Sequence, residues 1–249
     1  NSGTWDCQSH ATMSNPFGGT AAFNNTGTGT SKKSAGTGTS TVSIPFSNTG
    51  SVQALAGTLQ YTGAYTQTAG STTLNGGTIA STTSLSIQGG TLLGVGTASG
   101  NVTNAGHVAP GFSPGALGIS GTYTQSSAGN FDVEIGGTTP VTQYDQLNVT
   151  GAVTFSGTLN VSLVNGFIPD DVSSTFTLMT YASRTGTFSA LNLPPATPEA
   201  PWVVVYGATS LVLEKLDSDH DGWGDSFDCA PFDPGAFALP GEITGEAFA

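Results

Sequence analysis

A short motif that recurs along the chain constrains the fold more than any other feature. Phe-Asn-Asn-Thr-Gly at residues 23–27 returns as Phe-Ser-Asn-Thr-Gly at residues 46–50, and a weaker copy lies at residues 102–106. Residues 1–3 resemble the end of the same unit, so we expect the chain to begin inside a repeat. It starts with Asn and shows no secretory signal, so we expect it to be mature, trimmed or a fragment. Repetition of this kind predicts stacked structural units.

Within the repeats the strand signal is short and alternating. Polar and apolar residues alternate at residues 72–74, 84–87, 148–150 and 158–163, and glycine or asparagine follows soon after. Alternation with a period of two places Leu, Ile and Val on one face and Thr, Ser and Asn on the other. Glycine pairs supply the corners between strands.

Two architectures could use this pattern. An antiparallel sandwich also has short strands with regular turns. A β-solenoid further predicts coils of about 20–24 residues whose similar residues stack in register, and the recurring motif favours it. Charged residues are only 8% of the chain, which suits stacking because like charges about 4.8 Å apart repel. We therefore expect an all-β solenoid domain over residues 1–213, with around ten coils and uncharged Asn and Thr ladders on its outer faces.

Charge and hydropathy exclude several functions. The chain has 4 Lys and Arg residues against 16 Asp and Glu, for a formal net charge of -12. Four cations cannot neutralise a run of phosphates, so nucleic-acid binding is not expected. The sequence contains no apolar run of about 18 residues, so a membrane-spanning helix is not expected.

A combination of motifs resembles a known class of surface protein. The residues are Val-Ala-Pro-Gly-Phe-Ser-Pro-Gly at 108–115, Tyr-Thr-Gln at 123–125, Phe-Asp-Val-Glu-Ile at 131–135 and Tyr-Asp-Gln-Leu at 144–147. Together they resemble the passenger regions of bacterial autotransporters and related adhesin-like proteins. The resemblance implies a right-handed parallel β-helix in a bacterial protein outside the cell.

An acidic segment over residues 214–249 carries the sharpest chemical signal. With position 1 at Asp217, carboxylates stand at positions 1, 3, 5, 9 and 12 and Gly222 at position 6, the spacing of an oxygen-ligand calcium loop. The predicted ligands are the carboxylates of Asp217, Asp219, Asp221, Asp225 and Asp228 and the carbonyl of Trp223. Such carboxylates would repel one another without a cation, which favours Ca²⁺ over the alternative of a solvated acidic linker.

The flanks of this loop do not predict EF-hand helices. Residues 203–206 and 210–213 before the loop look like strands, and three prolines follow it. The segment instead resembles a thrombospondin type 3-like repeat, in which Asp-rich loops and a cysteine surround calcium.

The two cysteines lie near opposite ends of the chain. In a rod, Cys7 and Cys229 would be too far apart for an intrachain bond. Head-to-tail stacking of chains could bring them together, and exposed strand edges at the rod ends invite such stacking. An interchain disulfide, an intrachain disulfide and two free thiols all remain open.

A few weaker signals bear on the alternative of an enzyme. Asp132 and Glu134 share one face of a strand, and paired carboxylates can hydrolyse glycosides. The chain offers few acids and bases to complete such a site, so an exposed strand face is the expectation and no catalytic residue is assigned. His107 occupies the repeat position of Ser51, which predicts a solenoid surface position, and Ser113 lacks a nucleophile-elbow motif.

We therefore expect a structural protein, extracellular or at the cell surface, that forms part of a fibre or adhesin, self-associates head to tail and is rigidified by calcium. A surface glycan or receptor is a possible partner. The alternative is a secreted β-helix that binds or degrades polysaccharide.

Overall fold

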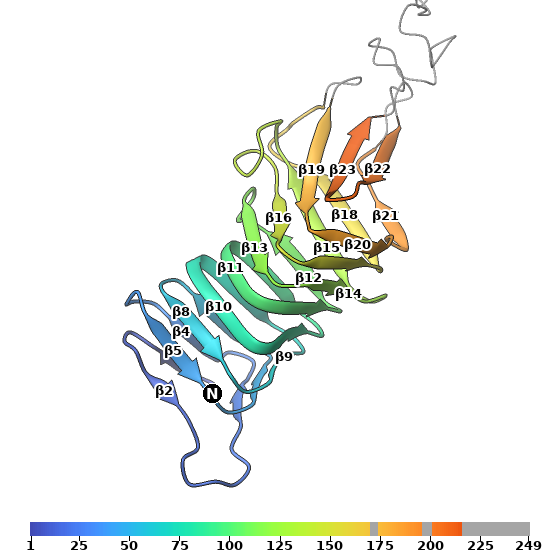
Figure 1. Cartoon of the computed structure of the whole chain (residues 1–249). Coiled ribbons are helices and arrows are strands. Elements are labelled where there is room, and N and C mark those ends of the chain that lie inside the picture. The colour runs from blue at the N-terminus through green and yellow to red at the C-terminus, as the bar shows by residue number, and fades with distance from the viewer. Residues whose placement is uncertain (170–173, 196–200, 216–249) are drawn as a thin grey trace, which may run out of the picture.

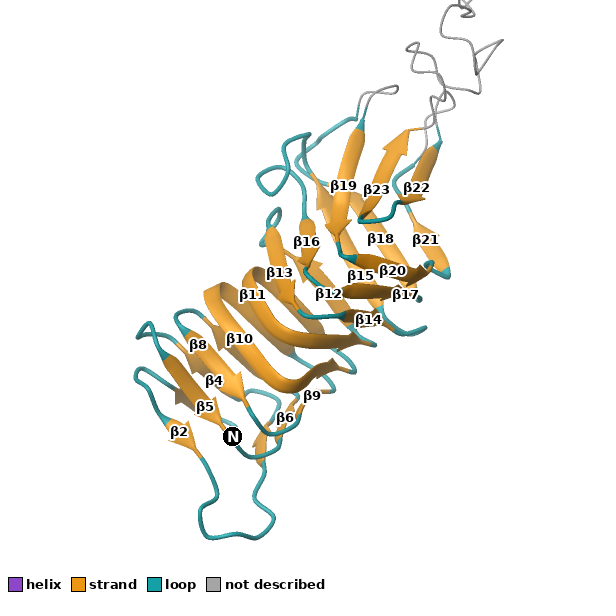
Figure 2. Cartoon of the chain, viewed as in Figure 1, coloured by secondary structure: helices purple, strands orange, loops and turns teal. Residues whose placement is uncertain are grey.

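The described chain is built entirely from β-strands. The structure is a computed structural model that describes residues 1–169, 174–195 and 201–215, and no helix occurs in these ranges. Nearly all strand pairs are parallel and join segments one repeat apart, in a solenoid-like stack of coils (Figures 1 and 2). The expected all-β class is confirmed, and the alternative of an antiparallel sandwich is wrong.

Strands in equivalent positions of successive coils pair into three columns. The first column contains β1 (Thr4–Asp6), β4 (Thr30–Lys33), β7 (Ser51–Ala54), β10 (Ser71–Ile87), β11 (Thr91–Asn104), β12 (His107–Pro110), β15 (Asn130–Ile135), β18 (Thr158–Leu163) and β21 (Ala190–Asn192). The second contains β2 (Thr12–Met13), β5 (Thr39–Val42), β8 (Thr58–Tyr61), β10, β11, β13 (Ala116–Ser120), β16 (Gln146–Val149) and β19 (Thr175–Thr180). The third contains β3 (Phe23–Asn25), β6 (Phe46–Asn48), β9 (Tyr65–Gln67), β10, β11, β14 (Tyr123–Gln125), β17 (Ala152–Phe155) and β20 (Ser183–Gly186). β10 and β11 bend through all three columns without a break.

The coils are fewer and less regular than expected. Eight coils lie between β1 and β20, where the sequence suggested around ten. The register spacing is 20 residues from Ser51 to Ser71 but 16 from Thr91 to His107 and 32 from Thr158 to Ala190. The later coils are longer because they carry loops between the strands, as at residues 136–145, while the strands themselves keep their pairing.

Aromatic side chains stack along the inside of the third column. Phe23 and Phe46, the first residues of the two motif copies, pair in register and their rings stack at 5.1 Å with an interplanar angle of 14°. Phe46 also stacks on Tyr65 at 5.4 Å and contacts Tyr61 at 4.7 Å. Phe46, Tyr61 and Tyr65 are buried, so the recurring aromatic position forms part of the core.

The motif asparagines face the interior, which corrects the expectation that asparagine ladders cover the outer faces. Asn25 Nδ2 donates to Asn48 Oδ1 at 2.8 Å, and Asn48 Nδ2 donates to Gln67 Oε1 at 3.1 Å. All three side chains are at most 1% exposed. Asn48 Oδ1 also accepts from the N–H of Gly50 at 3.1 Å, so the amides satisfy backbone groups where the chain turns between coils.

We expect Asn48→Ala to lower the free energy of unfolding by about 2 kcal/mol, because it removes a buried amide that bonds two neighbouring coils and the Gly50 N–H. Urea denaturation followed by circular dichroism would measure the change. Asn24→Ala, in the exposed neighbouring position on β3, is the matched control and should change stability by less than about 0.5 kcal/mol. Equal effects of the two substitutions would contradict the role of the ladder.

An antiparallel hairpin ends the second column. β22 (Trp202–Tyr206) pairs with β23 (Ser210–Lys215), and β23 pairs antiparallel with β19. The two segments predicted as strands are thus confirmed. The predicted domain boundary after residue 213 falls within β23.

Candidate functional site

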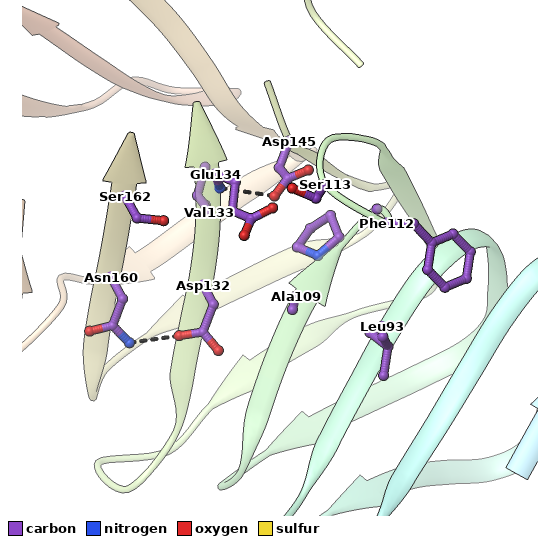
Figure 3. Close-up of a pocket in the computed structure, with 12 residues that line it drawn as sticks. Leu93, Ala109, Phe112, Ser113, Asp132, Val133, Glu134, Asp145, Asn160 and Ser162 are labelled. Atoms are coloured by element: carbon purple, nitrogen blue, oxygen red, sulfur yellow. Dashed lines mark hydrogen bonds between the residues drawn. The ribbon is translucent and has the colours of Figure 1, made fainter. Parts of the chain in front are cut away.

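A hollow of about 400 Å³ opens on the outer face of the first column (Figure 3). It lies between β11, β15, β18 and the loop that joins β12 to β13. Its lining includes Leu93, Ala109, Phe112, Asp132, Glu134 and Asp145.

Small residues on β12 form the floor of the hollow. Leu93 pairs in register with Ala109, and the next strand places Asp132 beside it in the same outward row. Neighbouring side chains in such a row stand about 4.8 Å apart. The single methyl group of Ala109 therefore leaves space between Leu93 and Asp132 that a longer side chain would fill.

The loop after β12 forms one wall. Gly111 has a φ of +85°, and a Cβ there would lie 2.3 Å from the backbone nitrogen of Gly115, so the close loop requires glycine. Phe112 is 49% exposed. Its ring lies over Gly94, where a Cβ would approach Phe112 Cζ to 3.0 Å. The loop thus presents an aromatic side chain at the rim of the hollow.

Asp145 fixes this loop to the opposite wall. Its Oδ1 accepts from the N–H of Gly115 at 2.7 Å and its Oδ2 from the N–H of Glu134 at 2.9 Å. The side chain is 2% exposed. Burial raises the pKa of Asp145 to about 7, against the opposing effect of the two backbone hydrogen bonds and with a further contribution from the charge of Glu134. Asp145 therefore has a structural role in shaping the hollow.

Asp132 and Glu134 lie on the same face of β15, as their spacing predicted. Asp132 Oδ2 lies 2.7 Å from His107 Nδ1, and its Oδ1 accepts from Asn160 Nδ2 at 2.7 Å. Glu134 points into the hollow (Figure 3), and its carboxylate forms no hydrogen bond or ion pair with any residue that the structure describes. The sequence predicted an exposed strand face but not that these residues line a hollow.

Three carboxylates line the hollow, those of Asp132, Glu134 and Asp145. Of these, only Glu134 has no partner within the described ranges. Hydrolysis by paired carboxylates needs two that can reach the same bond. Asp132 and Asp145 are both held by other groups. The Glu134 carboxylate is therefore placed to meet a group that enters the hollow.

His107 lies where the repeat predicted it. It pairs in register with Thr91, which continues the outward row of Ser51 and Ser71, and its side chain is 47% exposed. This confirms the predicted surface position. The hydrogen bond to Asp132 is an addition that the sequence did not indicate.

The predicted calcium ligands lie outside the described residues, as does Cys229. They are Asp217, Asp219, Asp221, Trp223, Asp225 and Asp228. Cys7 is described and is only 4% exposed, and burial raises the pKa of its thiol. The pairing of the two cysteines stays a prediction. In the described part of the chain, no group of three or more His, Cys, Asp or Glu residues is placed to hold a metal ion.

Comparisons with known proteins assign no family. No protein-family model matches the chain, and no curated protein is significantly similar to it in sequence. Within the described ranges, no helix has the length and apolar character needed to cross a membrane.

Proposed function

We propose that this chain is a rod-like segment of a bacterial surface fibre or adhesin, wound as a right-handed parallel β-helix. The observation that supports this best is the stacking of eight coils in register around an apolar interior. At about 4.8 Å per coil, the stack would be about 40 Å long. The resemblance to autotransporter passenger regions supports the handedness and a location outside the cell.

The outer faces suit a stacked rod. Thr30, Ser51, Ser71 and Thr91 follow one another in register along the first column. Uncharged hydroxyl groups can stack at this distance without the repulsion that like charges would create. The low share of charged residues in the whole sequence is therefore consistent with a structural role.

Both ends of the stack offer strand edges for head-to-tail association. The N–H of Thr30 donates to Gly3 O, and the N–H of Cys7 donates to Lys32 O. In a parallel ladder, the backbone groups of Thr4 and Asp6 between them then point away from β4. At the other end, β20 and β21 continue the parallel columns and bond to a strand on one side only in the described chain. A second copy of the chain is the partner that fits, because its strands run in the same direction.

The acidic segment is the proposed site for calcium. The ligand spacing of residues 217–228 would place several carboxylate oxygens and the Trp223 carbonyl around one ion. Binding would neutralise part of the net charge of -12, much of which belongs to this acidic segment. We propose that the ion stiffens the segment that follows β23 and so permits end-to-end contact.

Negative-stain microscopy of the full chain should show filaments in calcium and short particles in EDTA. Thr4→Pro should shorten the filaments, because it removes an N–H that points toward the next subunit and proline blocks edge pairing. Thr4→Val keeps that N–H and is the matched control. Asp219→Asn combined with Asp221→Asn should abolish the response to calcium.

Single short particles under both conditions would contradict head-to-tail assembly. Filaments that are insensitive to EDTA and to the double substitution would contradict the role of calcium while leaving the rod intact.

A further inference from the structure

We propose that the hollow beside Glu134 binds a primary ammonium group carried on an apolar stem or ring. Its walls combine an unpaired carboxylate with an apolar floor and the exposed ring of Phe112. A cation on an apolar support would meet the carboxylate at one end and the floor and aromatic ring along its length. Binding at this hollow requires no assembly of the rod.

The cation has to come from outside the chain, because all its own strong cations are engaged. Lys32 lies 3.7 Å from Asp6, and Lys33 is fully buried and donates to Ala35 O at 3.0 Å. Arg184 donates to Tyr206 O at 2.7 Å. Lys215 lies over the ring of Trp202 at 4.8 Å. These four residues are the whole complement of Lys and Arg in the sequence.

His107 does not pair with the Glu134 carboxylate either. Its Nδ1 contacts Asp132 Oδ2, while Asp132 Oδ1 is taken by Asn160. Glu134 lies two residues further along β15, beside Ser162 of the next coil. The carboxylate of Glu134 is therefore available to a ligand while the Asp132 carboxylate is oriented by its neighbours.

The shape of the hollow favours an organic cation over a metal ion. A space of about 400 Å³ is in the range of small-molecule sites and far exceeds the volume of a bare ion. Leu93, Ala109 and Pro110 offer methyl and methylene groups to the ligand in place of oxygen ligands. A lysine side chain carries the ammonium group on a methylene stem, and an amino sugar carries it on a ring whose C–H face can pack against the apolar floor.

Calorimetric titration of the full chain distinguishes the two sources. We expect binding of Nα-acetyl-lysine methylamide, of glucosamine, or of both, and loss of binding when the amine of each is acetylated. Binding of the lysine derivative alone identifies a protein side chain as the ligand, and binding of glucosamine alone identifies an amino sugar. Added salt should weaken the interaction because it is partly ionic.

Glu134→Gln should weaken binding about tenfold or more, because it removes the charge from the hydrogen bond to the ammonium group. The backbone N–H of Glu134 that bonds Asp145 is retained in this variant, and circular dichroism would verify the fold. Glu214→Gln on β23 is the matched control and should bind like the original chain. Absence of binding by both amines, equal binding of the acetylated compounds, or unchanged affinity of Glu134→Gln would overturn the proposal. Filament formation is measured separately, so either proposal can fail without the other.

Discussion

Phe46→Ala should lower the free energy of unfolding of the N-terminal coils by about 3–5 kcal/mol, the range for truncating a buried phenylalanine. Phe46 is 1% exposed and contacts Phe23, Tyr61 and Tyr65 in the coils on either side. Its loss would leave a cavity where three coils meet. Urea denaturation followed by circular dichroism, with hydrogen exchange to locate the effect, would measure the change.

Phe17→Ala is the matched control for this prediction. Phe17 is 97% exposed in the loop between β2 and β3, so its truncation should change stability by less than about 0.5 kcal/mol. Because each coil contacts only its neighbours, the increased hydrogen exchange of Phe46→Ala should be concentrated near β3, β6 and β9. Uniform destabilisation along the whole rod would contradict the stacked arrangement.

Stability should also fall as pH rises from about 4 to 7, through the contribution of Asp145. Its folded pKa is raised to about 7 from the ordinary value of 3.8. The folded state then binds a proton that the unfolded state has already lost, so this contribution is complete below pH 3.8 and is lost as pH rises through about 7. The shift corresponds to a contribution on the order of 4 kcal/mol.

The measurement is the difference between the original chain and Asp145→Asn, because other carboxyl groups also titrate in this range. Free energies of unfolding from denaturation at a series of pH values should show a smaller dependence between pH 4 and 7 in the variant. The absolute stability of Asp145→Asn is not the test, since asparagine can accept only one of the two backbone hydrogen bonds. Parallel curves for the two proteins would contradict a raised pKa.

Periodic features of the sequence predicted the periodic features of the fold. The interval between the motif copies matches the register of Phe23 with Phe46 and of Asn25 with Asn48. Alternation of polar and apolar residues identified β18, and both strands of the terminal hairpin were also predicted as strands. These features are local or repeat at a fixed interval, so a single sequence records them.

Other features depend on contacts that a single sequence does not record. Asparagine is polar, so its repetition suggested an outer ladder, yet the amides bond one another and the backbone inside the coil corners. Loops of varied length between the strands make the later coils longer, so the chain forms fewer coils than expected while the strands keep their pairing.

The candidate site was predictable only in part. The spacing of Asp132 and Glu134 placed them on one face, and this is where the structure has them. Phe112 and Asp145 join them through loops whose paths depend on tertiary contacts, such as the two backbone hydrogen bonds accepted by Asp145. The lone sequence signal for that loop is the glycine-rich stretch around Phe112.

Each coil bonds only to the coils next to it, and this determines how the molecule would respond to a pulling force. Tension applied at one end would detach the outermost turn first and leave the remainder folded. Each turn of 20 residues, such as the one from Ser51 to Ser71, would release about 70 Å of extended chain. Such a tether would lengthen in steps under load instead of rupturing at once.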